Sequence, residues 1–477
     1  MTFRRILLTV AVTAGIMTSC NRTAPISHQD WAPDVKAALN DFIKTYGGND
    51  GKDYVVFDFD NTTSIFDVSL QLMAHQLETM SFNQTPEEFS GYIRSALSGC
   101  WDTVSDRIEE IDSDYAALYD KYGPFSYKGL DSAACEVIRN DSLWVDFAGK
   151  MGGTYRFLDE NDSVENAFIW VMGWMAGMNG DEAYDLSYRS HKIYADKNTS
   201  IRSIGDYDWV EGIQVTENLK ELWKALDENG IDVWVCSASS VEAVIAAVDA
   251  FGMHDWCTGV VAMTFGKDST GRLTSNYDYE TGKAWMAQKD GTWTEGEYAS
   301  RVETWGDGKV TSIINCIEPL YGGRGPLAGF MDSTGDFNFC TEFSSLKLSL
   351  CFNRGSRKVT DGGGLIAETA LYERDVLGYN LKKANAAGDI LYLLQGRDEN
   401  GLRTLRPSNA TMRLGEDSEI LLFNDENRAQ LEWMEKNRMS VKEIMEKFSV
   451  ITPADDPSNP LGFDYGFLKE YHGYRSR

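Results

Sequence analysis

The sequence predicts an α/β fold, in which a parallel sheet forms the core and a large helical cap is inserted after the first strand. Three observations lead to this prediction. A short apolar run, residues 54–57, has the length and composition of a buried strand. A long stretch with helical character follows it, and from Thr216 onward helices and strands alternate. Such alternation is typical of parallel sheets, because parallel strands need crossover connections.

The fold is expected to begin with a helix. A proline opens an amphipathic pattern over residues 33–46, and the pair Gly47-Gly48 ends it. After the strand 54–57, the inserted segment is predicted to be helical, most clearly over residues 163–178 and 182–193. The first of these two helices is apolar almost all round, so we expect it to be buried.

The second part of the chain has the pattern of the core. Ser239 with Glu242 predicts a capping box for a helix over residues 241–251, and the Gly/Thr/Tyr/Trp-rich stretch up to Trp305 resembles hairpins. The other expected strands are residues 231–236, 260–265, 327–331 and 347–352, and further helices are expected to begin near residues 217 and 308. Beyond residue 355 we expect a loop at 362–364, a strand over 390–394 and a closing helix over 431–448.

These patterns divide the chain into a targeting peptide, a cap and a core. Residues 1–20 are the peptide, residues 67–205 form the helical cap, and residues 21–66 and 206–477 together form the discontinuous core. With 477 residues, of which 43% are hydrophobic, the chain is long enough for cores of this size.

The net charge restricts the partners. A formal charge of −28 argues against nucleic acid and against an anionic membrane surface. A negative surface also repels a free anionic substrate. Any phosphate site here therefore needs local positive charge, from a metal ion together with a lysine or backbone amides.

The N-terminus has the pattern of an export signal. Arg4 and Arg5 precede an apolar run over residues 6–17, which is too short for a stop-transfer helix. Cys20 follows Met-Thr-Ser, a context that resembles the bacterial lipobox and predicts lipidation of Cys20; ordinary cleavage nearby, with Cys20 incidental, is the alternative. We expect an exported protein, either periplasmic or a membrane-anchored lipoprotein whose only membrane contact is the N-terminal lipid.

The remaining seven cysteines are an odd number for an exported chain, so they cannot all pair internally. Cys236 and Cys316 lie in apolar periodic stretches and are expected to be buried thiols. The sequence does not choose between the candidate bridges, which are Cys100 with Cys135 and Cys340 with Cys351.

Four groups of polar residues, each at a strand end or a helix start, have the residue types that phosphoryl transfer needs. They are Asp58-Phe59-Asp60-Asn61-Thr62, Ser237-Ala238-Ser239, Lys309 and Asp332-Ser333-Thr334-Gly335-Asp336. Asp58 is placed as a nucleophile toward phosphorus, and Asp60 can protonate the leaving oxygen and then deprotonate water. The Thr62 hydroxyl can bond to the turn that holds the two aspartates.

The later groups complete a phosphate and metal site. Ser237 offers a hydroxyl beside the amides of a helix start, and Lys309 supplies a fixed positive charge. Asp332 can share a cation with Asp58, and Asp336 can bind or orient that cation. Carboxylate ligands around a hard cation that also meets phosphate oxygens point to Mg²⁺.

Each group also has a purely structural interpretation. The aspartates can be turn formers, Ser237 a helix-start residue, and Lys309 a solvated lysine. The segment 332–336 can be an ordinary strand-to-helix turn. Their joint occurrence, in this order and each at a strand end or helix start, favours a catalytic site.

The four groups resemble the motifs of the haloacid dehalogenase (HAD) superfamily of phosphohydrolases. The resemblance implies a HAD-like core in which Asp58 is the nucleophile and Asp60 the acid/base. It also implies Mg²⁺ held by Asp58, the Asp60 carbonyl and Asp332. Met331 departs from the family, which usually has glycine at that position. Residues 31–355 look most similar to the phosphoserine phosphatase and phosphorylcholine phosphatase branch, notably over residues 174–178 and 233–239.

The same resemblance implies a small phosphomonoester as substrate, with phosphorylcholine first and phosphoserine next. Asp67 falls where relatives place a carboxylate that faces the substrate's amine, and a helix N-terminal aspartate is the alternative. Trp170 and Trp174 are candidates for stacking on a quaternary ammonium, and a place in the cap core is the alternative. A phosphotransferase with the same intermediate, or a non-catalytic binding protein, are the alternative functions.

Overall fold

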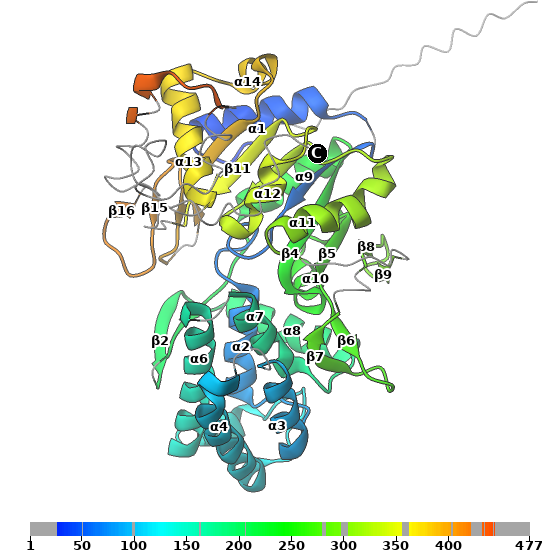
Figure 1. Ribbon diagram of the computed structural model, residues 1–477, viewed down its shortest axis with the longest axis vertical. Coiled ribbons are helices and arrows are strands. Elements are labelled where there is room, and N and C mark those ends of the chain that lie inside the picture. Colours follow the sequence, from blue (N-terminus) through cyan, green and yellow to red (C-terminus); the bar gives the residue numbers. More distant parts are fainter. Residues whose placement is uncertain are drawn as a thin grey trace, which may run out of the picture.

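The structure is a computed structural model in which an α/β core lies above a helical cap in the view of Figure 1. It describes residues 26–49, 51–97, 101–161, 164–205, 207–278, 283–296, 304–354, 362–401, 404–420, 432–433, 435–441 and 443. The predicted export signal and Cys20 lie outside these residues, and so does most of the predicted closing helix. Among the described helices, none combines the length and the apolar character needed to cross a membrane.

The core is built on an eight-stranded sheet with the order β12-β11-β10-β1-β4-β5-β8-β9. The strands from β12 to β5 are mutually parallel, and β8 and β9 continue the sheet as an antiparallel edge. The strands are β1 (Asp53–Phe57), β4 (Ile231–Ser240), β5 (Gly259–Met263), β8 (Trp285–Ala287), β9 (Trp293–Glu295), β10 (Ala328–Met331), β11 (Leu348–Phe352) and β12 (Leu391–Gln395). The predicted α/β class with a Rossmann-like parallel core is confirmed.

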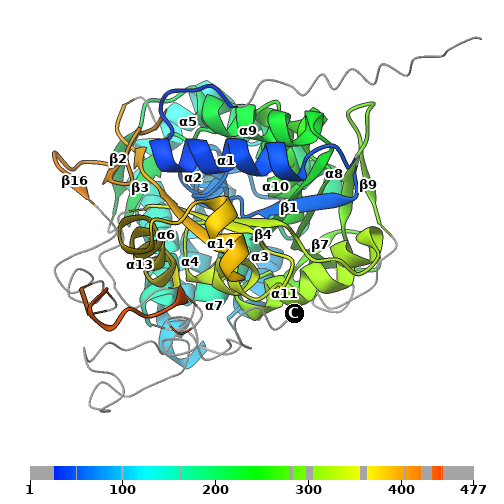
Figure 2. The same cartoon turned by 90° about the horizontal axis from the view of Figure 1, so that it is seen from above.

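Helices cover both faces of the sheet (Figure 2). Alternate residues of β1 serve the two faces: Val55 and Phe57 pack with α1, α9 and α10, whereas Tyr54 and Val56 pack with α11, α12 and α13. A strand that is buried on both sides reads as a continuous apolar run, which is why residues 54–57 are recognisable in the sequence. These helices are α1 (Pro33–Tyr46), α9 (Glu217–Glu228), α10 (Val241–Ala250), α11 (Asp307–Ser312), α12 (Phe337–Thr341) and α13 (Gly362–Tyr372).

The cap follows β1 and contains the helices α2 to α8 and a β-hairpin. Its interior is an aromatic cluster in which Phe82 contacts Phe89, Tyr115, Phe147 and Trp174. The cap elements are α2 (Val68–Thr79), α3 (Pro86–Ser95), α4 (Trp101–Tyr122), α5 (Ser132–Arg139), α6 (Ser142–Asn161), α7 (Val164–Met172), α8 (Gly180–Ala195), β2 (Ser200–Ile204) and β3 (Tyr207–Glu211).

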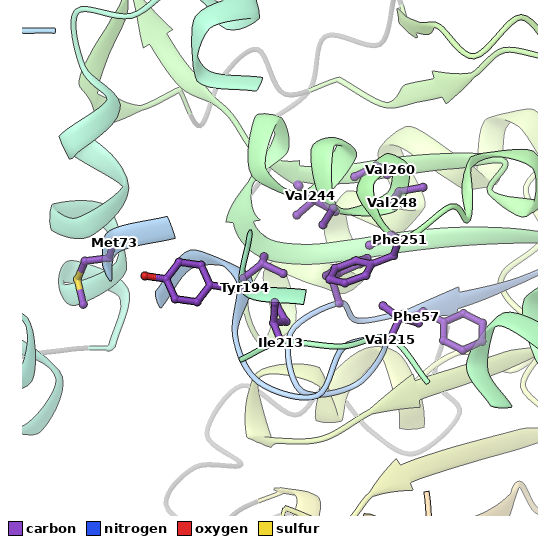
Figure 3. Close-up of a cluster of buried hydrophobic side chains, with 14 of the residues drawn as sticks. Phe57, Met73, Tyr194, Ile213, Val215, Val244, Val248, Phe251 and Val260 are labelled. Atoms are coloured by element: carbon purple, nitrogen blue, oxygen red, sulfur yellow. The ribbon is translucent and has the colours of Figure 1, made fainter. Parts of the chain in front are cut away.

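Apolar packing joins the cap to the core. One cluster of buried side chains runs without interruption from β1 and α10 to cap residues such as Met73 and Tyr194 (Figure 3). A second connection is the hairpin of β6 (Phe265–Lys267) and β7 (Leu273–Tyr277), which extends from the core. Its Leu273 exchanges backbone hydrogen bonds with the cap segment after α7.

A small four-stranded sheet, order β14-β13-β15-β16, follows the core strand β12 along the chain. Its strands are β13 (Arg397–Asp398), β14 (Thr404–Leu405), β15 (Thr411–Met412) and β16 (Glu419–Ile420), and the short helix α14 (Leu381–Ala387) precedes β12. No motif in this part of the chain predicts a function.

Several local expectations were wrong. The N-cap of α10 is Ser240, whose hydroxyl accepts from the Ala243 amide, and not Ser239 in a capping box with Glu242. Helix α10 itself starts at Val241, as expected, because strand β4 continues to Ser240. The glycines at 362–364 form the first turn of α13 rather than a loop. The helix expected over residues 163–178 ends at Met172, where a 3-10 turn takes over.

The proposed disulfides are also wrong. Cys135 and Cys340 are free thiols, so neither candidate bridge forms in this structure. The expectation for Cys236 and Cys316 is confirmed, because both are free and buried.

We predict that acid destabilises the folded protein through His191, at the contact between α8 and α10. His191 on α8 is buried there, and its Nε2 lies 3.0 Å from the Ala243 carbonyl oxygen. Burial lowers the pKa of His191 from 6.5 to about 4. As the pH falls from 6.5 to 4, His191 therefore binds a proton in the unfolded chain but stays neutral in the folded protein. This linkage removes about 3 kcal/mol of stability over that window.

His191→Gln retains an N–H donor for the Ala243 carbonyl but cannot titrate. Denaturant unfolding at successive pH values should show a wild-type stability that falls more steeply below pH 6.5 than that of the variant. Parallel curves for the two proteins between pH 6.5 and 4 would contradict the prediction.

Candidate active site

The sheet brings the predicted site residues together at one edge. Strand β1 lies between β10 and β4, with Phe57 beside Phe330 and Val235. Asp58 follows β1 directly, and its backbone N–H donates to the Phe330 carbonyl at 3.0 Å. Asp332 lies just beyond the carboxyl end of β10, and Ser237 lies within β4, two residues after the pair with β1. The order of the strands therefore places these side chains next to one another.

The loop after Asp58 is held by its own hydroxyl groups. Thr63 donates to the Asp58 carbonyl at 2.7 Å, and Ser64 donates to the Phe66 carbonyl at 2.7 Å. Thr63, and not Thr62 as predicted, thus bonds to the turn. The Thr62 hydroxyl instead lies 3.4 Å from Asp332 Oδ1, at the edge of hydrogen-bonding range.

Three carboxylates converge in the site. Ligand oxygens of Asp58, Asp332 and Asp336 all lie within 4.8 Å of one another, and all three residues are buried. Lys309, which is only 1% exposed, donates from Nζ to Asp58 Oδ1 at 2.7 Å and also to Asp336 Oδ1. The ammonium therefore sits between two members of the cluster and fixes their positions.

Asp60 lies beside this cluster with both carboxylate oxygens engaged. Its Oδ1 accepts from the Val68 amide at 2.7 Å, and its Oδ2 accepts from the Ser239 hydroxyl at 2.6 Å. The orientation of the Asp60 side chain is thus fixed by hydrogen bonds from both α2 of the cap and β4 of the core. Ser237 is fully buried, and its hydroxyl accepts from the Ser239 amide at 3.2 Å.

Negative charge exceeds positive charge in this buried site. The interacting groups are the carboxyls of Asp58, Asp60, Asp67, Asp332 and Asp336 and the cations Lys309 and Arg354. Burial raises the pKa of Asp58 despite the nearby ammonium. Burial, assisted by the Asp67 and Asp58 charges, raises the pKa of Asp60 well above its ordinary value. Burial also raises the pKa of Asp336, with Asp58 adding to the effect.

The excess charge and the donor set fit a hard divalent cation. Burying unpaired carboxylates is costly unless protons or a metal ion neutralise them. Asp58, Asp332 and Asp336 offer only oxygen ligands, which suits Mg²⁺ better than zinc or copper. The Asp60 side chain lies outside this cluster, so its predicted metal contact depends on its backbone carbonyl.

Two arginines that the sequence did not single out also contact the site. Arg354, just after β11, donates to Asp332 Oδ2 at 2.9 Å with a side chain 44% exposed. Arg397, on β13, donates to the carbonyl of Asn61. Neither arginine lies in a recognisable motif. Only the position of Arg354 at a strand end could have drawn attention to it.

Asp67, the first of the candidate substrate-binding residues, lies at the start of α2 and beside the site. Asp67 caps α2, because its Oδ1 accepts from the Ser69 and Leu70 amides at 2.8 and 3.1 Å. It also interacts electrostatically with Asp58 and Arg354, and burial raises its pKa to about 6. Asp67 thus fits its structural alternative while also facing the site.

Trp170 and Trp174 lie in the apolar core. Each is 1% exposed, and the two rings meet edge to face with centroids 5.1 Å apart. Trp174 also contacts Phe82 of the aromatic cluster in the cap. The structure gives neither indole a contact with the carboxylates, so stacking on a substrate stays a prediction.

Comparisons with known proteins give a shared fold but no family. No family model matches the sequence, and no curated protein matches it. The chain is similar to the crystal structure of a conserved protein of unknown function from Anaerococcus prevotii DSM 20548. That similarity has a TM-score of 0.60 and 22% identity, and it covers 83% of this chain and 100% of the other. It shows that the two chains share their fold.

Two further solved structures are more distant. A protein of unknown function from Bordetella pertussis Tohama I has a TM-score of 0.31 and 12% identity, covering 63% of this chain and 89% of that one. Cytosolic 5'-nucleotidase IIIB, bound to cytidine, has a TM-score of 0.28 and 14% identity, covering 69% and 82%. At TM-scores this low, neither similarity supports a conclusion about this chain.

We predict that Mg²⁺ stabilises the folded protein and that Asp332→Asn removes most of this effect. A ligand that binds only the folded state adds about 2.7 kcal/mol at a concentration 100 times its Kd. The test is thermal unfolding with Mg²⁺ and with a chelator. Asp268→Asn, in an exposed turn, is the control and should respond as the wild type does. Equal responses of the wild type and Asp332→Asn would contradict the assignment.

Proposed function

We propose that the protein is a Mg²⁺-dependent phosphomonoester hydrolase of the HAD type that acts through an aspartyl-phosphate intermediate. The observation that carries the proposal is the convergence of Asp58, Asp332 and Asp336, with Lys309 bonded to two of them. Asp60 supports it, because its carboxyl is held beside Asp58 by two hydrogen bonds. A turn or a simple ion pair needs none of this arrangement.

The reaction has two steps, both at Asp58. In the first, an Asp58 oxygen attacks phosphorus, the bond to the ester oxygen breaks, and Asp60 gives its proton to the leaving alcohol. In the second, Asp60 takes a proton from water, and the resulting hydroxide attacks phosphorus. The Asp58–phosphorus bond then breaks and releases phosphate. The raised pKa of Asp60 suits the first step, which needs a protonated carboxyl.

Other groups hold the reactants and balance charge. Lys309 orients Asp58 and offsets the charge of Asp336 while an anionic substrate enters. Asp58, Asp332 and Asp336 would hold Mg²⁺, which would neutralise them and polarise the phosphate oxygens. The cap, whose helix α2 supplies the Val68 amide to Asp60, would exclude bulk water from the intermediate.

The substrate class that these contacts favour is a small phosphomonoester such as phosphorylcholine or phosphoserine. Asp67 would attract a cationic amine, as in both compounds. Arg354 is half exposed and would attract an additional carboxylate, which only phosphoserine carries. A panel of phosphomonoesters, assayed for phosphate release with Mg²⁺ and with chelator, tests the proposal. Absence of Mg²⁺-dependent release from every ester would favour a binding protein.

A phosphotransferase would use the same aspartyl-phosphate and pass it to an alcohol instead of water. The two activities separate when acceptor alcohols are added to the assay. New phosphoesters at the expense of free phosphate would identify transfer.

We predict that Asp58→Asn abolishes turnover while the fold remains intact. An amide cannot form the acyl phosphate, so kcat should fall by about 10³-fold or more. Asp60→Asn keeps one side-chain oxygen that can accept from the Val68 amide but loses the transferable proton, and kcat should fall by about 10²- to 10⁴-fold. Phosphate release and circular dichroism check both variants. Activity of Asp58→Asn within tenfold of the wild type would refute its role as nucleophile.

We predict that Arg354 selects between the two candidate substrates. Arg354→Met should lower the ratio of kcat/KM for phosphoserine to that for phosphorylcholine by about tenfold, which is about 1.4 kcal/mol. The ratio cancels any effect of the variant on Asp332 or on the metal, because both substrates share that chemistry. A ratio equal to that of the wild type would assign Arg354 to Asp332 alone.

A further inference from the structure

Arg397 is a buried arginine that reaches the catalytic loop from the small C-terminal sheet. It lies on β13 and is 2% exposed. Its guanidinium donates to the backbone carbonyl of Asn61 at 2.5 Å and to Asn61 Oδ1 at 3.2 Å. Both acceptors belong to the residue between Asp60 and Thr62, although Arg397 is 336 positions further along the chain.

Asn61 is the point at which the loop turns. Its φ is +60°, in the left-handed region, which asparagine tolerates better than most residues. Its own N–H donates to the Phe66 carbonyl at 3.2 Å. Arg397 therefore holds the carbonyl and the side chain of a residue whose amide is already fixed. The orientation of the adjacent Asp60 depends on this turn.

The charge of Arg397 is balanced locally. Glu399 Oε1 accepts from Arg397 Nε at 2.9 Å and from a terminal nitrogen at 2.6 Å. Glu399 is itself tied to the small sheet, since its Oε2 accepts from the Leu414 amide at 3.3 Å. A guanidinium that is neutralised and buried in this way is unsuited to binding a substrate phosphate, but it is well suited to fixing a loop.

The same sheet reaches a second segment of the site. The Thr411 hydroxyl accepts from the Arg397 amide at 3.0 Å and donates to the Asn353 carbonyl. Asn353 precedes Arg354, which bonds to Asp332. The small sheet thus contacts two segments of the site. One is the loop that carries Asp60, and the other is Asn353, whose neighbour Arg354 bonds to the carboxylate of Asp332.

We propose that Arg397 is a positioning residue and that the small sheet clamps the catalytic loop through it. The clamp holds Asn61, and through Asn61 it keeps the neighbouring carboxyls of Asp58 and Asp60 in reacting position. The catalytic part of this proposal rests on the proposed phosphohydrolase function. The structural part does not, so the two can be tested separately.

The experiment compares Arg397→Met, which removes the bonds to Asn61, with Arg406→Met as a matched control. Arg406 directly follows β14 of the same small sheet, is partly buried, and bonds to Asp398 and Glu419 rather than to the loop. Amide hydrogen exchange reports the loop directly through the hydrogen-bonded amides of residues 61, 63 and 64. Arg397→Met should speed their exchange about tenfold while the β1 and β4 amides stay protected, and Arg406→Met should leave the loop unchanged.

The kinetic readout separates positioning from substrate binding. Arg397→Met should lower kcat about 10- to 100-fold and change KM less than about threefold, since displaced reacting groups slow the chemical step. Arg397→Lys keeps the charge but places its donors on one nitrogen instead of a planar fork, so its exchange and kcat should lie between those of the wild type and Arg397→Met. It also serves as the deciding variant where Arg397→Met does not fold.

Each result decides a separate point. Faster exchange confined to the loop supports the clamp, whether or not the protein hydrolyses any ester. Absence of hydrolysis of every ester would refute the proposed function and leave the clamp standing. Unchanged loop exchange in Arg397→Met, or in Arg397→Lys where that variant decides, would overturn the clamp. An equal loss of kcat in Arg406→Met would overturn the specific role of Arg397.

Discussion

The site depends on the ammonium of Lys309, which is buried between Asp58 and Asp336. Without it, a cluster of carboxylates would lie in the interior with the Arg354 guanidinium to oppose their charge. One ammonium does not balance them, and burial accordingly raises the pKa values of Asp58 and Asp336. The arrangement is stable only when protons or a divalent cation supply the missing charge. The same deficit makes the site receptive to a metal ion and, through that ion, to an anion.

The sheet determines which residues take part in this balance. Because β1 is paired on both sides, residues from β10 and β4 lie beside Asp58 although they are far away in the sequence. Strand β4 continues past the point expected from its apolar run and carries Ser239 to the carboxyl of Asp60. The site is thus a product of strand order, and each strand contributes polar residues at or just beyond the end of its apolar run.

This explains what could be predicted from the sequence. A strand buried on both faces gives an apolar run, and a polar group directly after it is visible without any knowledge of the fold; Asp58 and Asp332 are of this kind. Ser239 was assigned to the wrong bond, since a capping pattern shifted by one residue looks the same in the sequence. Arg354 and Arg397 were missed because their partners, Asp332 and Asn61, are fixed only by tertiary structure. The prediction of disulfide bridges was wrong for a related reason, because spacing along the chain does not determine the distance between two sulfur atoms.

The cap is constrained by the same apolar packing that stabilises the core. One continuous cluster of buried side chains joins the sheet to the cap, and the β6–β7 hairpin bonds to the cap at Leu273. Opening the whole cap as a rigid body would break these contacts and expose the cluster to water, at a cost that grows with the apolar area exposed. Substrate entry therefore requires movements smaller than separation of the two parts. Asp60 is bonded to Val68 of the cap and to Ser239 of the core, so any such movement changes the position of the acid/base itself.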